Sequence, residues 1–355
     1  MSNPKLVMFL LAGLVGACAS DPGNGGGDDV GGDDAPPFTD GVSVLSGHAE
    51  AGYVDGKRGV ARFANPVNVA HANGKVYVAD FDNSKIREVD AVTGTTTTLI
   101  SQQGFSRPFA MAFAGDGTMY VSTDRGPENQ QGAMAGTIWR VDINARTATP
   151  IANGIGRPRG IAVLPNGKLA VTDYQHHVVS IVDAVTGNVT PLAGAWDAPG
   201  MTDATGTEAL FNAPYGVVVK DGKLIVADHG NHRLREVSLD GSVRTLAGAG
   251  TAGFADGAMP TAQFSNPQGV TISAAGDVYI TDLQNYRIRK ITASGVETVA
   301  GSGTPGYADD DNLTNADFYG LEGLSVTSDG SKLYVADGGR GENVPYNRVR
   351  VVNLR

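Results

Sequence analysis

The chain has 355 residues, of which 41% are hydrophobic and 18% charged, so it has enough apolar surface for a folded core, which excludes disorder over its whole length. Its formal net charge of -10 argues against nucleic acid as a partner, because phosphate binding requires a basic surface. The single cysteine excludes an intramolecular disulfide and a zinc site built from cysteines.

The chain begins with the pattern of an exported protein. Lys5 precedes an apolar run at 6–19, which is too short to cross a bilayer core of about 30 Å and matches the hydrophobic part of a signal peptide. The letters VGAC, ending at Cys18, resemble the lipobox of bacterial lipoproteins. The resemblance implies removal of residues 1–17 and lipidation of the cysteine sulfur, and Ala19 in the next position gives no signal for retention at an inner membrane. An ordinary secretory signal with a chance cysteine is the alternative.

Residues 18–41 comprise this cysteine and a Gly/Asp-rich segment with almost no apolar residues. Such a composition predicts a self-repelling, flexible tether. Calcium binding by its aspartates is the alternative to a plain spacer, although the spacing of an EF-hand loop is absent.

Residues 42–355 repeat one unit six times. Each copy opens at or near a proline and carries an aspartate at the end of its second predicted strand. These aspartates lie 44 to 55 residues apart, which is the period of a four-stranded β-propeller blade. The copies open at Pro66, Pro108, Pro158, Pro214, Pro267 and Leu321, and the aspartates are Asp80, Asp124, Asp173, Asp228, Asp282 and Asp337.

Within each copy the residue types favour four strands. A turn pair such as Asn73-Gly74 separates the first two strands, and the second is a β-branched and aromatic run such as VYVA at 76–79. A third strand with basic residues follows, for example at 233–235, and then a fourth, for example at 243–246. No segment beyond the signal peptide shows a sustained helical period.

The fourth copy carries a family signature. The letters ADHGNHRL at 227–234 resemble the Asn-His-Leu motif that names NHL repeats, and the resemblance extends over 42–355. It implies an all-β fold, a six-bladed β-propeller of the NHL type. The second and third copies depart from the pattern, because TIW at 137–139 and VVS at 178–180 replace the basic third strand.

The last copy lacks a fourth strand, since the chain stops after its third strand at 348–354. The letters GVSVLSG at 41–47 resemble the fourth strand of another copy, GSVRTLAG at 241–248. We therefore predict that Val42–Leu45 completes the last blade and pairs an edge that would otherwise be open. Deleting 19–38 should then leave the melting temperature nearly unchanged, and deleting 19–48 should unfold the chain.

Four connectors between copies share the formula G-x-x-D and end in a phenylalanine. We expect each aspartate to accept hydrogen bonds from nearby backbone N–H groups, and each phenylalanine to wedge between neighbouring sheets. The aspartates are Asp55, Asp203, Asp256 and Asp309, and the phenylalanines are Phe63, Phe211, Phe264 and Phe318.

The strand-closing aspartates are expected to lock loops, and in four copies the bases of the third strand could pair with them. Asp124 and Asp173 stand in the two copies that lack those bases. We expect these two carboxylates to be solvated, with binding to other partners as the alternative.

The residue after each opening position is the best candidate for function, because its context is constant while its chemistry varies. The resemblance to NHL propellers implies that the first strand lines a central channel, so these side chains would form an asymmetric ligand pocket at its mouth. Bonds among themselves, such as Arg159 to Glu322, are the alternative. The residues are Val67, Phe109, Arg159, Tyr215, Gln268 and Glu322, with Asn68 next to Val67.

Two loops that follow second strands are longer than the others and belong to the same face. They are Arg125–Gly136 and Gly338–Tyr346, and Arg125 and Arg340 are their candidate ligand contacts. Long loops on a rigid scaffold often carry recognition, and tolerated insertion is the alternative.

Two families of metal-dependent propeller enzymes provide an alternative interpretation. Zinc lyases related to NHL proteins use histidines around the channel, although His232 fills the repeat's own histidine position here. Calcium-dependent lactonases use acid and amide side chains at strand starts. The zinc candidates are His176, His177 and His229, and the calcium candidates are Asn68, Gln268 and Glu322.

No serine–histidine–acid set and no phosphate-binding glycine motif can be assigned, so we predict no cofactor and favour a non-catalytic role. The expected protein is a monomer, lipid-anchored outside the cytoplasm at the outer membrane or cell surface, which binds a protein, peptide or glycan of the envelope. The alternative is a calcium- or zinc-dependent hydrolase or lyase of the lactonase or amidoglycolate-lyase type.

Overall fold

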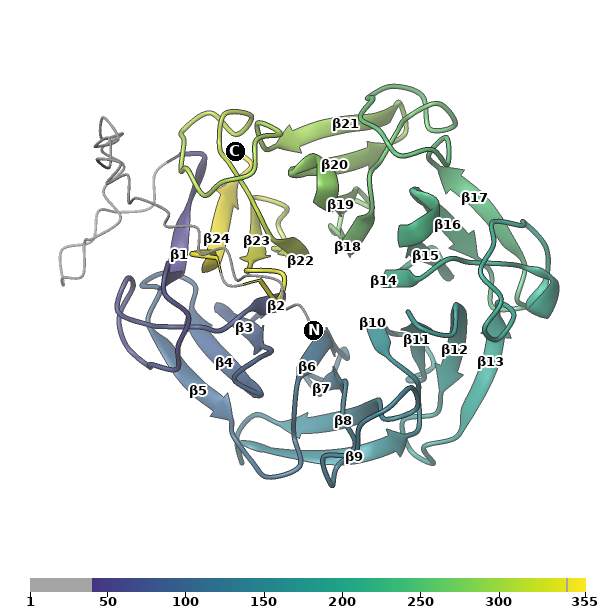
Figure 1. The fold of residues 1–355 in the computed structure, drawn as a ribbon, viewed down its shortest axis with the longest axis horizontal. Coiled ribbons are helices and arrows are strands. Elements are labelled where there is room, and N and C mark those ends of the chain that lie inside the picture. Colours follow the sequence, from purple (N-terminus) through teal and green to yellow (C-terminus); the bar gives the residue numbers. More distant parts are fainter. Residues whose placement is uncertain (1–39, 343) are drawn as a thin grey trace, which may run out of the picture.

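The computed structural model describes residues 40–342 and 344–355. Their strands form six antiparallel sheets of four strands each, arranged like blades around a central axis (Figure 1). The predicted all-β fold, a six-bladed β-propeller, is thereby confirmed. The signal peptide, Cys18 and the tether up to residue 39 lie outside the described residues.

The blades are numbered in chain order, and within each blade the strands are given from the one nearest the axis outward. Blade 1 holds β2 (Pro66–Ala72), β3 (Lys75–Asp80), β4 (Lys85–Asp90) and β5 (Thr96–Ile100), and blade 2 holds β6 (Pro108–Phe113), β7 (Met119–Thr123), β8 (Thr137–Asp142) and β9 (Thr147–Asn153). Blade 3 holds β10 (Pro158–Val163), β11 (Leu169–Asp173), β12 (Val178–Val182) and β13 (Val189–Ala193), and blade 4 holds β14 (Pro214–Lys220), β15 (Lys223–Asp228), β16 (Arg233–Val237) and β17 (Val243–Ala247). Blade 5 holds β18 (Pro267–Ile272), β19 (Val278–Asp282), β20 (Arg287–Thr292) and β21 (Gly295–Ala300), and blade 6 holds β22 (Leu321–Val326), β23 (Lys332–Asp337), β24 (Asn347–Asn353) and β1 (Val42–His48). The helical elements of the described residues are three short 3-10 turns, η1 (Gly206–Glu208), η2 (His229–Asn231) and η3 (Leu283–Asn285).

The N-terminal strand closes the ring, as the sequence predicted. β1 pairs antiparallel with β24, with Val42 opposite Val352, and is the outermost strand of blade 6 (Figure 1). The Val42 and Leu45 side chains are completely buried. The strand continues to His48, three residues beyond the predicted end at Leu45.

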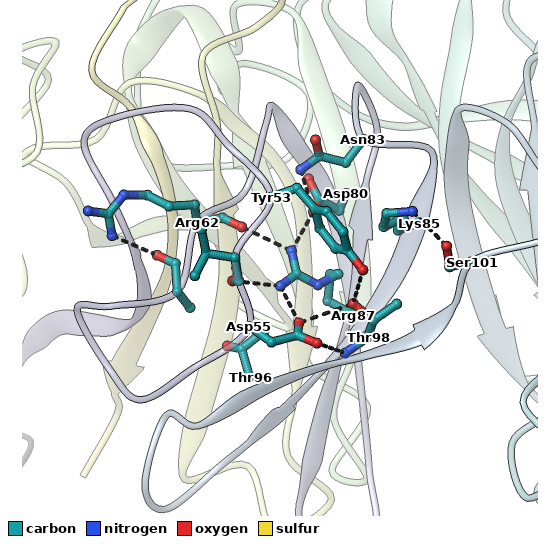
Figure 2. A network of polar contacts seen from close by, with 12 residues as sticks. Tyr53, Asp55, Arg62, Asp80, Asn83, Lys85, Arg87, Thr96, Thr98 and Ser101 are labelled. Carbon is teal, nitrogen blue, oxygen red and sulfur yellow. Dashed lines mark hydrogen bonds and ion pairs between the residues drawn. The ribbon is translucent and has the colours of Figure 1, made fainter.

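Four blades share a buried charge clamp, which in blade 1 is centred on Arg87 (Figure 2). The Arg87 guanidinium donates to Asp80 at the end of β3 at 2.8 Å and to Asp55 in the connector at 2.6 Å. It also donates to two connector carbonyl groups and lies over the Phe63 ring. Asp55 in turn accepts the backbone N–H of Thr98 on β5 at 3.0 Å. One arginine therefore joins three parts of a blade, and both the locking aspartate and the buried phenylalanine are as predicted.

The same clamp recurs in blades 4, 5 and 6. In each blade the arginine is completely buried between the strand-closing and the connector carboxylates. The connector aspartate binds a backbone N–H, as expected, but that group belongs to the fourth strand and not to the connector's own turn. The sets are Arg235 with Asp228 and Asp203, Arg289 with Asp282 and Asp256, and Arg350 with Asp337 and Asp309.

Blade 2 replaces the clamp with a neutral pair. Its register sets Pro108 opposite Thr123, so Thr123 and not Asp124 closes the second strand, which corrects the prediction by one residue. Trp139 stands where the four blades with a clamp have arginine, and it donates from Nε1 to the Thr123 hydroxyl at 2.8 Å. A large aromatic side chain thus fills the site without a charge.

The expectation that Asp124 and Asp173 are solvated is wrong, since their side chains are only 8% and 6% exposed. Asp173 is held by His176, whose Nδ1 lies 2.6 Å from the carboxylate, and by three backbone N–H groups. Asp124 is held by two arginines from blade 3, Arg157 and Arg159. Both carboxylates therefore bind groups other than a third-strand arginine, which was the alternative considered from the sequence.

Candidate functional site

The innermost strands of all six blades surround the propeller axis (Figure 1). Residues of these strands line a cavity of about 350 Å³. Its two ends differ in chemistry. The far end is lined mainly by aliphatic and aromatic side chains, including Phe113, Val163, Val219 and Ile272. The mouth, where the first strands begin, is lined by six of the predicted ligand contacts: Asn68, Phe109, Arg159, Tyr215, Gln268 and Glu322.

The mouth residues reach the axis because each inner strand is irregular where it begins. In every blade the register between first and second strands shifts directly after the opening residue. A glycine follows the mouth residue in four blades, and a Cβ atom at Gly216 would lie 2.5 Å from the carbonyl oxygen of Gln268 in the next blade. Neighbouring backbones therefore touch at the mouth. In blade 1 the residues differ, since Val67 is buried in the core and Asn68 lines the cavity in its place.

Arg159 does not present a free positive charge to the cavity. Its guanidinium forms a two-pronged ion pair with Asp124 and lies 4.1 Å from the centre of the Phe109 ring. Burial opposes the charge on Arg159, but the Asp124 carboxylate outweighs it and raises the arginine pKa. Burial likewise opposes the charge on Asp124, and Arg159 keeps the pKa of that carboxyl below its ordinary value. The pair is therefore ionised, and its charges largely cancel.

Two acceptors at the mouth lack donors. The Glu322 carboxylate has no hydrogen bond or ion pair with any described residue, although its side chain is only half-buried. Burial raises the pKa of Glu322 from 4.5 to about 7, against the opposing influence of Arg159 and Arg340. Gln268 is 4% exposed, and its Oε1 atom is buried without a partner. Because an unpaired buried acceptor is costly, Gln268 favours a ligand that donates hydrogen bonds, and the half-buried Glu322 can accept bonds from the same ligand.

An aromatic wall faces these acceptors. The Tyr215 ring packs against Phe109, Tyr174 and His229, with ring centres 5.8, 5.1 and 4.9 Å apart. Burial raises the pKa of Tyr215 to about 12 and lowers the pKa of His229 to about 4, so both rings are neutral near pH 7. The wall offers flat apolar surface with polar edges.

Tyr174 was missed as a site residue, and His229 was considered only as a metal ligand. Both stand directly after a strand-closing aspartate. Like the residues after the opening position, they vary in chemistry between blades, and that variation was the available signal.

The two loop arginines lie in different places. Arg340 lies near the mouth. Its positive charge opposes the raised pKa of Glu322 and adds to the lowered pKa of His229. Arg125 does not line the axial cavity and borders a separate one with Arg107 and Arg157.

The candidate histidines lie in structural contacts. His176 binds Asp173 and stacks on Trp196, with ring centres 4.0 Å apart. His177 accepts the backbone N–H of Ala213 through Nδ1 at 3.0 Å. Over residues 40–342 and 344–355, no three His, Cys, Asp or Glu side chains form a group that could hold a metal ion. The zinc site stays an untested prediction, while the calcium candidates Asn68, Gln268 and Glu322 all line one cavity.

Replacing Glu322 with glutamine should change how stability depends on pH. A carboxyl whose folded pKa is raised contributes stability below its unfolded pKa, and this stability is lost as pH rises through the folded pKa. The free energy of unfolding of Glu322→Gln, relative to wild type, should therefore increase between about pH 4.5 and pH 7 and stay level above that range. Urea unfolding of both proteins across this range measures the difference, and a pH-independent difference would contradict the raised pKa.

Comparison with known proteins agrees with this architecture. The family model of the NHL repeat matches residues 211–236, which run from the connector phenylalanine of blade 4 through most of β16. The fold is an NHL-type six-bladed β-propeller.

Two proteins are similar in sequence to most of this NHL-type propeller chain. "Protein SUPPRESSOR OF QUENCHING 1, chloroplastic" of Arabidopsis thaliana is 29% identical over 70% of this chain, and "NHL repeat-containing protein 2" of Homo sapiens is 26% identical over 70%. The chain spans only 27% and 42% of the lengths of these two proteins.

Solved structures also resemble the NHL-type propeller. An auxiliary nutrient binding protein from Bacteroides ovatus has a TM-score of 0.67 at 18% identity, covering 88% of this chain and 76% of the other. A virginiamycin B lyase from Staphylococcus aureus has a TM-score of 0.50 at 13% identity, covering 82% and 96%. At these identities the likeness concerns the fold. Among the described residues, no helix is long and apolar enough to span a membrane.

Proposed function

We propose that this protein is a binding module of the bacterial cell envelope that takes a glycan unit at the mouth of its axial cavity. Of the three ligand classes considered from the sequence, a sugar suits the mouth best. Sugar hydroxyl groups donate hydrogen bonds, and the apolar face of a sugar ring can lie on an aromatic side chain. The mouth offers Glu322 and Gln268 as acceptors and Tyr215 as the centre of its aromatic wall.

The observation that carries the proposal is the pair of unsatisfied acceptors. Glu322 and the Gln268 Oε1 atom lie on neighbouring inner strands, β22 and β18, and neither has a donor among the described residues. A cavity of about 350 Å³ has the size of a small-ligand site. The name of the Bacteroides ovatus neighbour, an auxiliary nutrient binding protein, supports a binding role.

The proposal includes attachment to the membrane through Cys18. Residues 1–17 would be the signal peptide, 18–41 the lipid-bearing tether and 42–355 the propeller. Two or three acyl chains would hold the protein firmly, because each buried methylene contributes about 0.8 kcal/mol. Cys18→Ser should then shift the protein from the membrane fraction to the soluble fraction, and an unchanged distribution would disprove the anchor.

The glycan proposal is tested by titrating the full-length protein with a panel of neutral oligosaccharides and short peptides. We expect saturable binding of at least one oligosaccharide, weakened about tenfold or more in Glu322→Gln and in Tyr215→Ala, since each loses a charge-assisted bond or a stacking surface. Glu297→Gln is the matched control, because Glu297 is a 58% exposed glutamate on the outer strand β21. Binding of peptides alone, or equal losses in the control, would refute the proposal.

The alternative of a calcium-dependent hydrolase rests on Asn68, Gln268 and Glu322, whose oxygen atoms border the same cavity. Oxygen atoms are the ligands that calcium prefers. Elemental analysis distinguishes the two functions: stoichiometric calcium in the wild type, lost in Glu322→Ala, would favour the enzyme over the glycan-binding module.

A further inference from the structure

A second cavity, of about 380 Å³, lies over blades 2 and 3 and is bordered by three arginines. It lies on the same face as the mouth, since its lining residues precede first strands or follow second strands. We refer to it as the rim cavity. Its lining includes Arg107, Arg125, Arg157 and Asp124, with Gln131 and Gln175 as exposed amides.

Two of these arginines occupy a repeat position where the fold does not need them. The residue directly before the opening position is Asn65, Ala213, Asn266 or Gly320 in the other four blades. What the fold uses there is the backbone N–H: Arg107 donates it to Ser84, as Ala213 donates it to His177. Arg107 also adopts a positive φ of 56°, a conformation that long side chains rarely adopt. The repeat therefore requires the backbone N–H at this position and does not require an arginine side chain.

The charges around the rim cavity do not balance. Arg159 already neutralises Asp124 through its two-pronged pair, so the 3.2 Å contact of Arg157 reaches a carboxylate that is satisfied. Asp82 lies 3.6 Å from Arg107, whose guanidinium stacks on Phe81. Asp173 is a third carboxylate nearby, because it accepts the backbone N–H groups of Arg157 and Gln175. Four arginines thus lie near three carboxylates, which leaves an excess of positive charge in a chain whose net charge is -10.

The donors of these arginines are only partly used. Arg125 donates to the neutral side chain of Asn129 at 2.9 Å, and no salt bridge of Arg125 is found in the described part of the chain. The Arg107 Nε atom is buried without a hydrogen-bond partner. The side chains of Arg107 and Arg157 are 38% and 40% exposed, so a solute can reach them. Besides Asp124, the β7–β8 loop has one acid, Glu128, which borders a different cavity.

We propose that the rim cavity binds the oxyanion group of an acidic ligand, a carboxylate, sulfate or phosphate. Guanidinium groups match such anions in charge and in the geometry of their paired N–H donors. Gln131 and Gln175 supply further amide donors at the edge. This site is separate from the glycan mouth and goes beyond the proposed function, because Arg107, Arg125 and Arg157 do not line the axial cavity.

The test uses the full-length protein titrated calorimetrically with sodium sulfate, sodium phosphate and sodium glucuronate, with chloride holding the ionic strength constant. We expect saturable binding of at least one anion, weakened about tenfold in Arg125→Gln and in Arg157→Gln, as expected for the loss of one charge-assisted contact. The preferred anion identifies the ligand group. Arg125→Gln removes only one side-chain contact, to Asn129, so this variant keeps the test valid if Arg157→Gln folds poorly.

Two control variants establish whether anion binding is specific to the rim cavity. Arg244→Gln changes an exposed arginine on the outer strand of blade 4 and should leave anion binding unchanged. Glu322→Gln should also leave it unchanged, so failure of the glycan proposal is distinguishable from failure of this one. Absence of saturable binding for all three anions, or equal weakening in Arg125→Gln and Arg244→Gln, would overturn the proposal.

Discussion

A chain that begins at residue 49 should fail to unfold cooperatively, whereas a chain that begins at residue 40 should show one sharp transition. The shorter chain loses β1 and with it the fully buried side chains of Val42 and Leu45. Burial of each contributes about 1.5–3 kcal/mol, and a domain has only about 5–15 kcal/mol in total. Loss of the strand also exposes the full edge of β24, which favours aggregation.

Circular dichroism during heating, with light scattering in parallel, measures this difference. The chain from residue 40 is the matched control, because it keeps every strand of the ring. Loss of β1 also disturbs the charge clamp of blade 6, since Val44 donates its backbone N–H to the connector carboxylate of Asp309 at 3.1 Å. Equal melting temperatures for the two chains would show that β1 contributes nothing to closure.

Replacing Arg235 with methionine should destabilise the propeller by about 3–5 kcal/mol, because the change leaves the Asp228 carboxylate buried without its cation. The arginine is completely buried, lies 2.7 Å from Asp228 and 2.6 Å from Asp203, and donates to two connector carbonyls. Methionine approximates the length of the side chain, so the loss is one of charge and hydrogen bonds more than of volume.

The control for Arg235 lies in the same blade. Arg244 pairs with Glu236 at 2.8 Å but is 63% exposed, so Arg244→Met should change the free energy of unfolding by only about 0–1 kcal/mol. Urea unfolding of both variants measures the two effects. Losses of similar size would mean that the clamp is no more important than a surface ion pair.

The fold and its closure could be predicted because their signals are periodic and local. A blade repeats its turn pairs and strand runs, and the letters of β1 resemble those of another fourth strand. The clamp was recognised only in parts. Asp203 and the basic strand at 233–235 were each noted, but Asp203 and Arg235 lie 32 residues apart, and a carboxylate in a connector could as well serve its own turn.

The end of the second strand of blade 2 was predicted one residue too late. The letters Thr123-Asp124 allow either residue to end the strand, and aspartate ends it in the other blades. The observed register is accompanied by a hydrogen bond from Trp139 Nε1 to the Thr123 hydroxyl, and no neighbouring letters reveal that contact. Asp124 then lies beyond the strand, where Arg159 of the next blade reaches it.

The sequence predicted which residues lie at the candidate site but not which of their charges are neutralised by neighbouring residues. The six mouth residues do line one cavity, because repeat equivalence fixes where each inner strand begins. Arg159 was expected to contact the ligand or to bond with Glu322, yet it forms an ion pair with Asp124 that spans two blades. Such a pair depends on the distance between blades, which the linear sequence does not contain. Glu322, considered as a partner of Arg159, is in consequence the group left without one.

The direction of β1 determines on which side of the ring the polypeptide enters the propeller. β1 starts with Val42 beside Val352 and ends with His48 beside Asn347, at the same side of blade 6 as the end of β23 and the start of β22. The cavity mouth opens on that second side, so the polypeptide enters the ring at its perimeter on the opposite side. Under the proposed attachment through Cys18, the propeller would therefore be held from the side opposite the mouth, and the mouth would stay accessible to a ligand.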